Sequence, residues 1–269
     1  SDVCSSDLRD FRTRRIEEKS RLAADELQSI RAFGSESELE QVAAEISRRQ
    51  QLLIDEIELT MENLRLGAIQ GIVTDADAST IVNYFTEFGI SQPAEIAFDI
   101  ANTADGDLRG KIAANVVRPI RRNAKGLVML NDVIWGLCGD TFFDEIVNHV
   151  EVRDVIKRSP RGLELLEGTA FETFDYGGVR WVNYQGTDDN STVAVGADLV
   201  KFFPASPRVF EMALSPGESF DMVNMPGQPM ISRVVMDEKR NEWADIEVAS
   251  YPLPICKRPH VLLRGKRGA

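Results

Sequence analysis

One long apolar stripe near the N-terminus constrains the fold more than any other feature of the sequence. Residues 9–66 contain no proline and a single glycine, Gly34, so the usual helix breakers are almost absent there. Beyond that glycine, apolar residues recur at spacings of three, four and seven, which places them on one face of an α-helix. These residues are Leu39, Val42, Ile46, Leu53, Ile57 and Leu64. The pattern predicts an amphipathic helix over residues 35–66, with a separate helix before Gly34 that starts near residue 9.

The ends and the width of this helix also follow from the sequence. Ser35 or Ser37 is suited to cap its first turn, and Gly67 is suited to end its last one. Four further apolar residues make the stripe wider than the narrow seam of a coiled coil. They are Leu52, Ile54, Leu59 and Met61. We therefore expect the helix to pack against a sheet or a neighbouring subunit.

The rest of the chain alternates between strand and helix patterns. Short apolar or alternating runs predict strands at residues 69–73, 83–85, 94–100, 127–130, 179–182 and 199–202. Helices are expected over residues 108–122 and 132–158. Eight of the 11 prolines lie within residues 204–259, which favours extended segments, and residues 230–236 and 243–251 flank a polar turn typical of a hairpin. The chain is therefore predicted to be an α+β protein.

Charge and cysteine content exclude several classes of protein. Lys and Arg total 31 against 43 Asp and Glu, giving a net charge of −12, so the chain is not expected to coat bare nucleic acid. No apolar run approaches the ~20 residues that span a bilayer, so no membrane contact is expected. Three distant cysteines (Cys4, Cys138 and Cys256) and two histidines do not match a disulfide framework or a usual zinc site. We expect no cofactor.

His149 is the one candidate for acid–base chemistry. It lies on the helix predicted over residues 132–158, with Glu145 and Arg153 about one turn to either side. No nucleophile motif, Walker loop or dinucleotide fingerprint accompanies it, which favours a partly exposed structural histidine over a general base. An acid–base enzyme built around His149 is the alternative. We assign no catalytic residue.

Two acidic turns resemble the beginning of calcium loops. Asp75-Ala76-Asp77 and Asp105-Gly106-Asp107 both place carboxylates at alternate positions. Neither continues with the carboxylate pattern and the terminal Glu that an EF-hand requires. Ordinary acidic turns are therefore favoured, and we predict no metal site.

The proline-rich tail carries the most specific motif of the chain. Phe202-Phe203-Pro204 is followed by Pro207, Phe210, Pro216, Val223-Asn224, Gly227 and Pro229. The motif then continues with Ser250-Tyr251-Pro252-Leu253-Pro254-Ile255-Cys256-Lys257-Arg258-Pro259. This region resembles the end of the lambda-type major capsid protein E family of tailed phages, and the order of the preceding elements is similar too. The resemblance extends from about residue 10 to the C-terminus.

This resemblance implies the fold shared by tailed-phage capsids and encapsulins. Residues 35–66 would be its spine helix, residues 9–105 and 225–269 a peripheral domain, and residues 106–224 an axial domain. The implied function is a structural subunit of the icosahedral head, which self-assembles around double-stranded viral DNA and is not an enzyme. The partners would be further copies in hexamers and pentamers, with scaffold, decoration and portal proteins, and the packaged DNA only through weak non-specific contact. The protein would be made in the bacterial cytoplasm, and an encapsulin-like compartment is an alternative.

Two basic clusters are candidates for contacts in such a shell. The first, at the head of the predicted first helix, consists of Arg9, Arg12, Arg14, Arg15, Lys19 and Arg21. It is either a solvated face or a contact with an acidic neighbouring subunit, in which case Arg12, Arg14 and Arg15 are candidate subunit-contact residues. The second cluster either faces packaged DNA or projects into solvent. It consists of Lys257, Arg258, Arg264, Lys266 and Arg267.

Residues 1–8 differ from the rest of the chain. The segment Ser-Asp-Val-Cys-Ser-Ser-Asp-Leu resembles a translated sequencing adapter, although a genuine disordered terminus is the alternative. In the resembled family an N-terminal arm and most of an extended loop would precede Arg9. We therefore expect the natural protein to continue upstream of the adapter-like segment.

Overall fold

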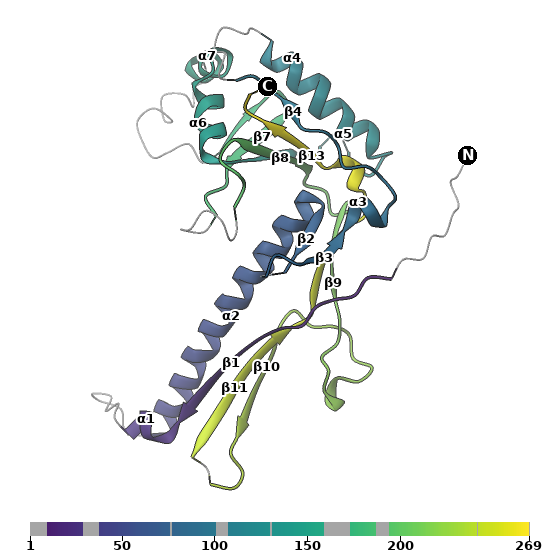
Figure 1. Ribbon diagram of the computed structural model, residues 1–269. Helices are drawn as coiled ribbons and strands as arrows, with labels where there is room; N and C mark the ends of the chain where they lie inside the picture. Colours follow the sequence, from purple (N-terminus) through teal and green to yellow (C-terminus); the bar gives the residue numbers. More distant parts are fainter. Residues whose placement is uncertain are drawn as a thin grey trace. The chain divides into compact units, whose positions relative to one another are not determined.

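Helices and strands are interspersed along the chain in the computed structural model, as expected of an α+β protein (Figure 1). The structure describes residues 10–28, 38–75, 77–100, 107–129, 131–158, 173–186, 194–240 and 242–268. The chain divides into two compact units. The first unit comprises Ser1–Glu62 and Met212–Leu253, and the second comprises Asn63–Glu211 and Pro254–Ala269. The boundary therefore falls within helix α2 (Glu38–Gln70) and strands β9 (Phe210–Leu214) and β12 (Pro252–Cys256), which form a two-stranded sheet.

The first unit is a three-stranded antiparallel sheet with the long helix α2 on one face. The strand order is β1 (Ile16–Ala23), β11 (Trp243–Ser250) and β10 (Ile231–Met236). Buried and partly exposed residues alternate along the whole of β11, because successive side chains point to opposite faces of a sheet. Helix α2 runs alongside the sheet (Figure 1), and the buried face of the sheet shares one apolar core with it. Its buried members are Leu22, Leu53, Ile57, Met61, Ile246 and Val248.

Helix α2 confirms the prediction of a long amphipathic helix, but it continues past the predicted end. Gly67 does not end the helix. A Cβ atom there would lie 2.9 Å from the carbonyl oxygen of Ile72, so the glycine permits the close approach of strand β2 (Ile72–Thr74). The helix ends before Gly71, whose φ of +86° favours glycine, and the strand predicted from residue 69 begins at residue 72. The predicted caps, Ser35 and Ser37, lie outside the described residues.

The predicted first helix is wrong over most of its length. Residues 16–23 form strand β1, and only α1 (Ala24–Gln28) is helical among the described residues before α2. The strand is paired along all eight residues with β11, more than 200 positions away in the sequence. This pairing overrides the local helix preference, because strand formation depends mainly on cross-strand neighbours and burial.

The second unit is built around a six-stranded mixed sheet. Its order is β4-β13-β8-β5-β7-β6, with β5 and β7 parallel and β8 antiparallel to β5. The strands are β4 (Ile96–Ala97), β5 (Ile134–Cys138), β6 (Thr173–Tyr176), β7 (Val179–Asn183), β8 (Leu199–Pro204) and β13 (Leu263–Lys266). The strands predicted at residues 179–182 and 199–202 are confirmed as β7 and β8.

An aromatic cluster fills the core of the second unit. Trp181 on β7 is fully buried and donates a hydrogen bond from Nε1 to the carbonyl oxygen of Tyr176 at 3.0 Å. Its ring stacks on Phe142 of helix α6 (Asp140–Asn148) with the centroids 6.1 Å apart, so this helix packs on the sheet through aromatic contacts. Phe98, Phe174 and Phe202 complete the cluster.

Two predicted elements of the second unit are wrong. Residues 127–129 form no strand, and residue 130 lies outside the described residues. They follow a turn at Lys125 and Gly126, both with positive φ, and the strand in this region is β5. The helix expected over residues 132–158 is instead α6 and α7 (Val150–Arg158), interrupted at His149, whose ψ is 137°. An apolar run alone does not identify a strand, and the glycine at position 126 is the stronger signal because it marks a turn.

Shorter elements complete both units. The strand expected at residues 83–85 is displaced: β3 (Thr80–Asn83) ends where the Asn83 side chain caps α3 (Tyr84–Glu87). The helix expected over residues 108–122 is confirmed as α4 (Leu108–Ile112), a π-helical turn η1 (Ala113–Val117) and α5 (Arg118–Asn123). The hairpin of β10 and β11 is confirmed, and the 3₁₀ turns are η2 (Phe220–Met222) and η3 (Pro259–Val261). No helix in the described ranges combines the length and apolar character needed to cross a bilayer.

Candidate assembly site

The outer face of the first unit's sheet carries a ladder of paired charges. The face opposite to α2 presents Glu17, Lys19 and Arg21 on β1, Asp245 and Glu247 on β11, and Arg233 on β10. Lys19 lies opposite Glu247, and its Nζ is 2.9 Å from a carboxylate oxygen of that residue. Arg21 lies opposite Asp245 and makes two hydrogen bonds to it, at 2.7 and 3.0 Å.

The ladder shifts the pKa of its members in the direction of their charged forms. The hydrogen bonds from Arg21 lower the pKa of Asp245, and those to Glu247 and Glu17 raise the pKa of Lys19. The guanidinium carbon of Arg21 also lies 4.3 Å from the ring centroid of Trp243. Exposed pairs of this kind contribute little to stability, so their main effects are to fix the register of β1 and to neutralise the face.

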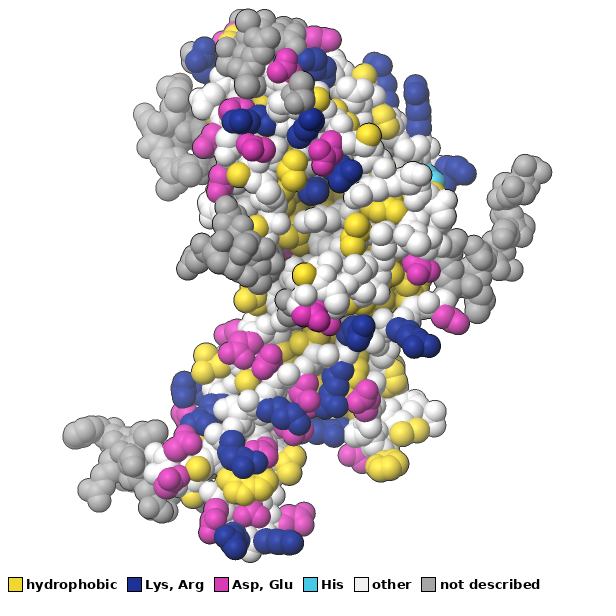
Figure 2. Space-filling view, in the orientation of Figure 1, with side chains coloured by type: hydrophobic (Ala, Val, Ile, Leu, Met, Phe, Trp, Pro, Cys, Tyr) yellow, Lys and Arg dark blue, Asp and Glu magenta, His cyan; other side chains and the backbone are white. Residues whose placement is uncertain are grey.

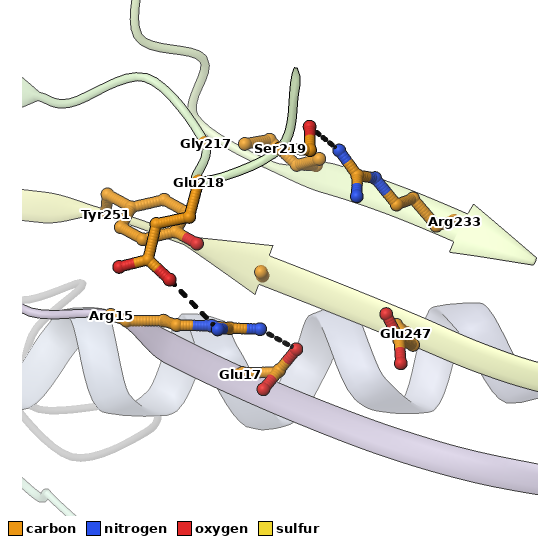
Figure 3. A pocket seen from close by; sticks show the side chains of 10 residues that line it. Arg15, Glu17, Gly217, Glu218, Ser219, Arg233, Glu247 and Tyr251 are labelled. Carbon is orange, nitrogen blue, oxygen red and sulfur yellow. Dashed lines mark hydrogen bonds and ion pairs between the residues drawn. The ribbon is translucent and has the colours of Figure 1, made fainter. Parts of the chain in front are cut away.

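Arg15 forms one wall of a cavity at the end of this ladder (Figure 3). The cavity measures about 190 Å³ and is bounded by β1, β11, β10 and residues 217–219 of the loop that follows β9. Arg15 donates hydrogen bonds to Glu17 on β1 and, at 3.1 Å, to Glu218 in the loop, while Arg233 bonds to Ser219. The loop is therefore fastened to the outer face of the sheet at two points.

The loop over residues 215–230 presents apolar side chains to solvent. Phe220 is 97% exposed, Val223 is 61% exposed and Met225 is 50% exposed. Figure 2 shows apolar side chains gathered over this loop of the first unit. Exposed apolar side chains grouped together mark surfaces that bind other molecules more often than solitary ones do. The loop therefore has the composition of a contact surface.

The base of this loop is fixed to the sheet. Gly227 lies so close to Leu214 that an added Cβ would be 2.2 Å from the Leu214 carbonyl oxygen. The hydroxyl of Ser250 donates a hydrogen bond to the carbonyl oxygen of Pro229 at 2.6 Å. Within the loop, the Met222 amide bonds to the Ser219 carbonyl at 2.9 Å. The apolar tip is thus presented on an anchored support.

The predicted contact residues do not act as one group. Arg12, Arg14 and Arg15 lie in an extended segment before β1 rather than on a helix, which corrects the placement expected from the sequence. Arg15 belongs to the cavity described above. Arg12 and Arg14 are exposed and make no hydrogen bond or ion pair with the part of the chain that the structure describes. Of the three predicted residues, Arg12 and Arg14 therefore have no partner among the described residues and are available to a second molecule.

His149 is much less accessible than the sequence suggested. Its side chain is 1% exposed, which corrects the expectation of a partly exposed residue and leaves a substrate in solution without access. Nδ1 has no hydrogen-bond partner among the described residues. Glu145, one turn earlier, accepts a hydrogen bond from Arg267 at 2.8 Å. The arrangement does not form an acid–base pair between His149 and that carboxylate.

The described ranges contain no group of three or more His, Cys, Asp or Glu side chains arranged to hold a metal ion. Asp77 accepts a hydrogen bond from the amide of Ser79 at 2.9 Å, as in an ordinary Asx turn. Residues 105 and 106 of the second acidic turn lie outside the described residues. Cys138 and Cys256 are both buried, and burial raises the pKa of the Cys256 thiol to about 12.

The second basic cluster is largely neutralised. Arg267 contacts Glu145 and Asp198, Arg264 lies 3.4 Å from Glu95, and Lys257 pairs with Glu211. These contacts hold the C-terminal strand β13 and the segment before it within the second unit. They favour a structural role for Lys257, Arg264 and Arg267 over a free basic surface.

A long helix on a small sheet and a second α+β unit make up a subunit with the tailed-phage capsid fold. Solved capsid structures share this fold at low sequence identity. A prophage protein of E. coli CFT073 assigned as a capsid protein has a TM-score of 0.54 at 12% identity, covering 93% of this chain and 76% of that protein. The capsid of cyanophage P-SCSP1u has a TM-score of 0.53 at 10% identity, covering 95% and 72%.

The sequence assigns the family within that class. Residues 5–267 match the family described as Phage major capsid protein E, and the chain belongs to this family. The major capsid protein of Salmonella phage Felix O1 is 24% identical over 272 residues, covering 90% of this chain and 73% of that protein. The protein is therefore a structural subunit of a phage capsid, which self-assembles into a shell and belongs to the virion head. The predicted family, fold class and function are confirmed.

Proposed function

We propose that the subunit forms hexamers and pentamers of an icosahedral head that encloses double-stranded DNA. In this proposal it catalyses no reaction, is made in the cytoplasm of a bacterial host, and meets scaffold, decoration and portal proteins during assembly. Residues 9–105 and 225–269 form the peripheral domain of the shell subunit, and residues 106–224 form the axial domain. The near-complete burial of His149 supports the non-enzymatic part of the proposal.

The exposed loop over residues 215–230 is the observation that carries the proposal. A closed shell needs patches that bind a different patch on the next copy, and repeated contacts of this kind add into a stable particle. The loop offers such a patch, because its apolar tip is solvent-exposed while its base is hydrogen-bonded to the sheet. Arg14 lies close to the base of this loop, because the side chain of its neighbour Thr13 donates a hydrogen bond to the Ser215 hydroxyl at 2.9 Å.

Electron microscopy of the purified protein tests the proposal directly. We expect closed shells, and particles isolated from the host should contain DNA. A protein that stays monomeric under all assembly conditions would contradict shell formation. Particles that enclose an enzyme in place of DNA would favour the encapsulin-like alternative.

Charge reversal separates the roles of the predicted contact residues. Arg14→Glu should reduce the yield of shells without changing the melting temperature, because Arg14 has no partner in the described part of its own subunit. Arg15→Glu should also loosen the loop, because it places a carboxylate beside Glu17 and Glu218. Arg240→Glu, at the exposed β10–β11 turn, is the control with the same change in charge. Normal shell yield in the Arg14 variant would remove that residue from the interface.

A further inference from the structure

Charge is segregated in the second unit in a way that the net charge conceals. Residues 108–131 contain six Lys or Arg residues and no Asp or Glu, although the whole chain carries −12. This stretch covers α4, η1, α5 and the turn that follows. An acidic chain that keeps one segment free of acidic residues retains a local positive field there.

The helix and the turn after it place four of these six cations on one exposed face. Leu108, Ile112, Val116, Ile120 and Ala124 are buried and form the opposite face. Arg118, Arg121 and Arg122 are exposed on α5 at helical spacings of three and four, and Lys125 is exposed in the turn that follows. We name these four residues the α5 cation face. The three arginines extend over about 6 Å of the helix, at 1.5 Å per residue. Figure 2 shows Lys and Arg side chains projecting from this part of the second unit.

The π-helical turn before α5 has a local cause. Pro119 has no amide hydrogen to donate to the preceding turn, and its ring crowds the carbonyl group four residues earlier. The Arg118 amide bonds to the Ala113 carbonyl, five residues back, which is the π pattern. Because of this wider turn, the helix continues past Pro119, and its buried face and its cation face continue with it.

The α5 cation face differs from the other basic surfaces because its charges are not compensated. Within the described ranges, its four members make no hydrogen bond or ion pair with an acidic side chain. By contrast, Arg180 pairs with Asp175 at 2.9 Å and Arg264 with Glu95 at 3.4 Å. The C-terminal dipole of α5 favours cations in its last turn, but it does not account for Arg118 in the first turn.

Residues after β12 extend the positive region. Arg258 donates a hydrogen bond from Nε to the carbonyl oxygen of Asn123 at 3.1 Å, which holds its side chain beside the end of α5. Burial lowers the pKa of His260, and the positive charges of Arg258 and Lys125 lower it further. The lowered pKa of His260 therefore reflects a local positive field, and the same field would attract an anion.

We infer that the α5 cation face binds the phosphate backbone of the packaged DNA. Arginine guanidinium groups match phosphate geometry with paired hydrogen bonds, and three of the four members are arginines. All four members of the face are cations, and none of them forms an ion pair within the described residues, which favours a polyanion as the ligand. The inference rests on the proposed function, because the enclosed DNA supplies the ligand. The contact is weak and independent of base sequence.

The salt dependence of DNA binding tests the inference. The probe is a fluorescently labelled duplex of random sequence, and binding to the purified protein is followed by anisotropy. Four phosphate contacts predict that affinity falls about 150-fold between 50 and 200 mM salt, because each contact contributes ~0.9 to the logarithmic slope. Arg121→Gln with Arg122→Gln removes two contacts, and the fall should shrink to about 12-fold. An unchanged slope would overturn the inference.

A matched variant controls for net charge. Lys239→Gln with Arg240→Gln removes two exposed cations from the β10–β11 turn and should leave the slope unchanged. An equal loss of slope in this control overturns the assignment to α5. Polyglutamate serves as a second probe, and a defect of the α5 variant confined to polyglutamate would indicate an acidic protein partner and overturn DNA binding.

Shell formation distinguishes failure of this inference from failure of the proposed function. The Arg121→Gln, Arg122→Gln variant should form shells as the unmodified protein does, with only DNA binding weakened. Loss of shells with an unchanged DNA slope would make the face a subunit contact and overturn the inference. Failure of the unmodified protein to form shells would refute the proposed function, whereas the DNA titration would still report on α5.

Discussion

Replacement of Phe220 by Ser should separate assembly from folding more sharply than any other single change. The side chain is 97% exposed in the subunit, so it contributes almost nothing to the core. Surface changes of this kind alter the free energy of unfolding by less than about 0.5 kcal/mol. The melting temperature of the unassembled subunit should therefore stay the same.

The expected effect on assembly follows from the area that Phe220 keeps available for burial. Complete burial of a phenylalanine side chain contributes about 1.5–3 kcal/mol. Because almost the whole side chain is exposed in the subunit, nearly all of that free energy is available to a contact between copies. At 1.4 kcal/mol for each factor of ten, the contact is weakened about 10- to 150-fold. The protein concentration at which shells begin to form should rise by a similar factor.

Sedimentation velocity measures this threshold concentration, and electron microscopy identifies the particles. Phe220→Tyr is the matched control, because it keeps the ring and should assemble at nearly the original concentration. If the Ser variant forms shells at the same concentration as the unmodified protein, the loop does not carry a subunit contact. If both variants fail to assemble, the position tolerates no change and the apolar burial is not the cause.

Two further predictions concern stability. Trp181→Ala removes the centre of the aromatic cluster and should lower the free energy of unfolding in denaturant by about 3–5 kcal/mol, with little change expected for an exposed site such as Arg240→Ala. Hydrogen bonds from Arg48 and Arg49 lower the pKa of Glu45 to about 2 from 4.5, so its stabilising contribution is complete above pH 4.5 and is lost as the pH falls towards 2. Unfolding measured across this range should lose less stability in Glu45→Gln than in the unmodified protein, and equal losses would refute the assignment.

Local periodicity explains why α2 was predictable and β1 was not. The stripe on α2 is set by residues three and four positions apart, so the sequence of that segment contains the whole signal. Strand β1 depends on β11, and Arg21 meets its partner Asp245 across 224 positions. A segment rich in arginine and glutamate has helical propensity by itself, and only the distant partner makes it a strand.

Turn chemistry accounts for the errors near β5. The apolar run at residues 127–130 and the strand at residues 134–138 look equally suitable for a strand. Lys125 and Gly126 adopt positive φ, and Asp132 accepts a hydrogen bond from the Met129 amide at 2.9 Å. Residues 125–129 therefore form a turn, which the Asp132 side chain stabilises. The dipeptide Lys125-Gly126 was the available signal, since glycine after a helix commonly marks its end.

The candidate site was only partly accessible from the sequence. Basic residues were recognised as contact candidates, but charge alone does not show that Arg15 is paired within its own subunit while Arg14 is not. The apolar loop was also missed, because exposure depends on the fold. Its signal was an aromatic residue, Phe220, among serine, proline and glycine, where apolar side chains have no helix or strand to bury them.

The cations on the sheet of the first unit are paired with carboxylates, whereas those of the α5 cation face are not. This difference suits the sheet to contact with another subunit and the α5 cation face to contact with DNA. On the sheet of the first unit, Lys19 and Arg21 are matched by carboxylates on the next strand, so a neighbouring copy need not bring counter-charges to approach the face. Contacts between subunits there can form through the apolar loop. Such apolar contacts are not weakened by salt. On the α5 cation face no carboxylate neutralises Arg121 or Arg122 in the described residues, so binding requires an external anion and weakens with salt. Shell contacts and DNA contacts are therefore separable by ionic strength within one subunit.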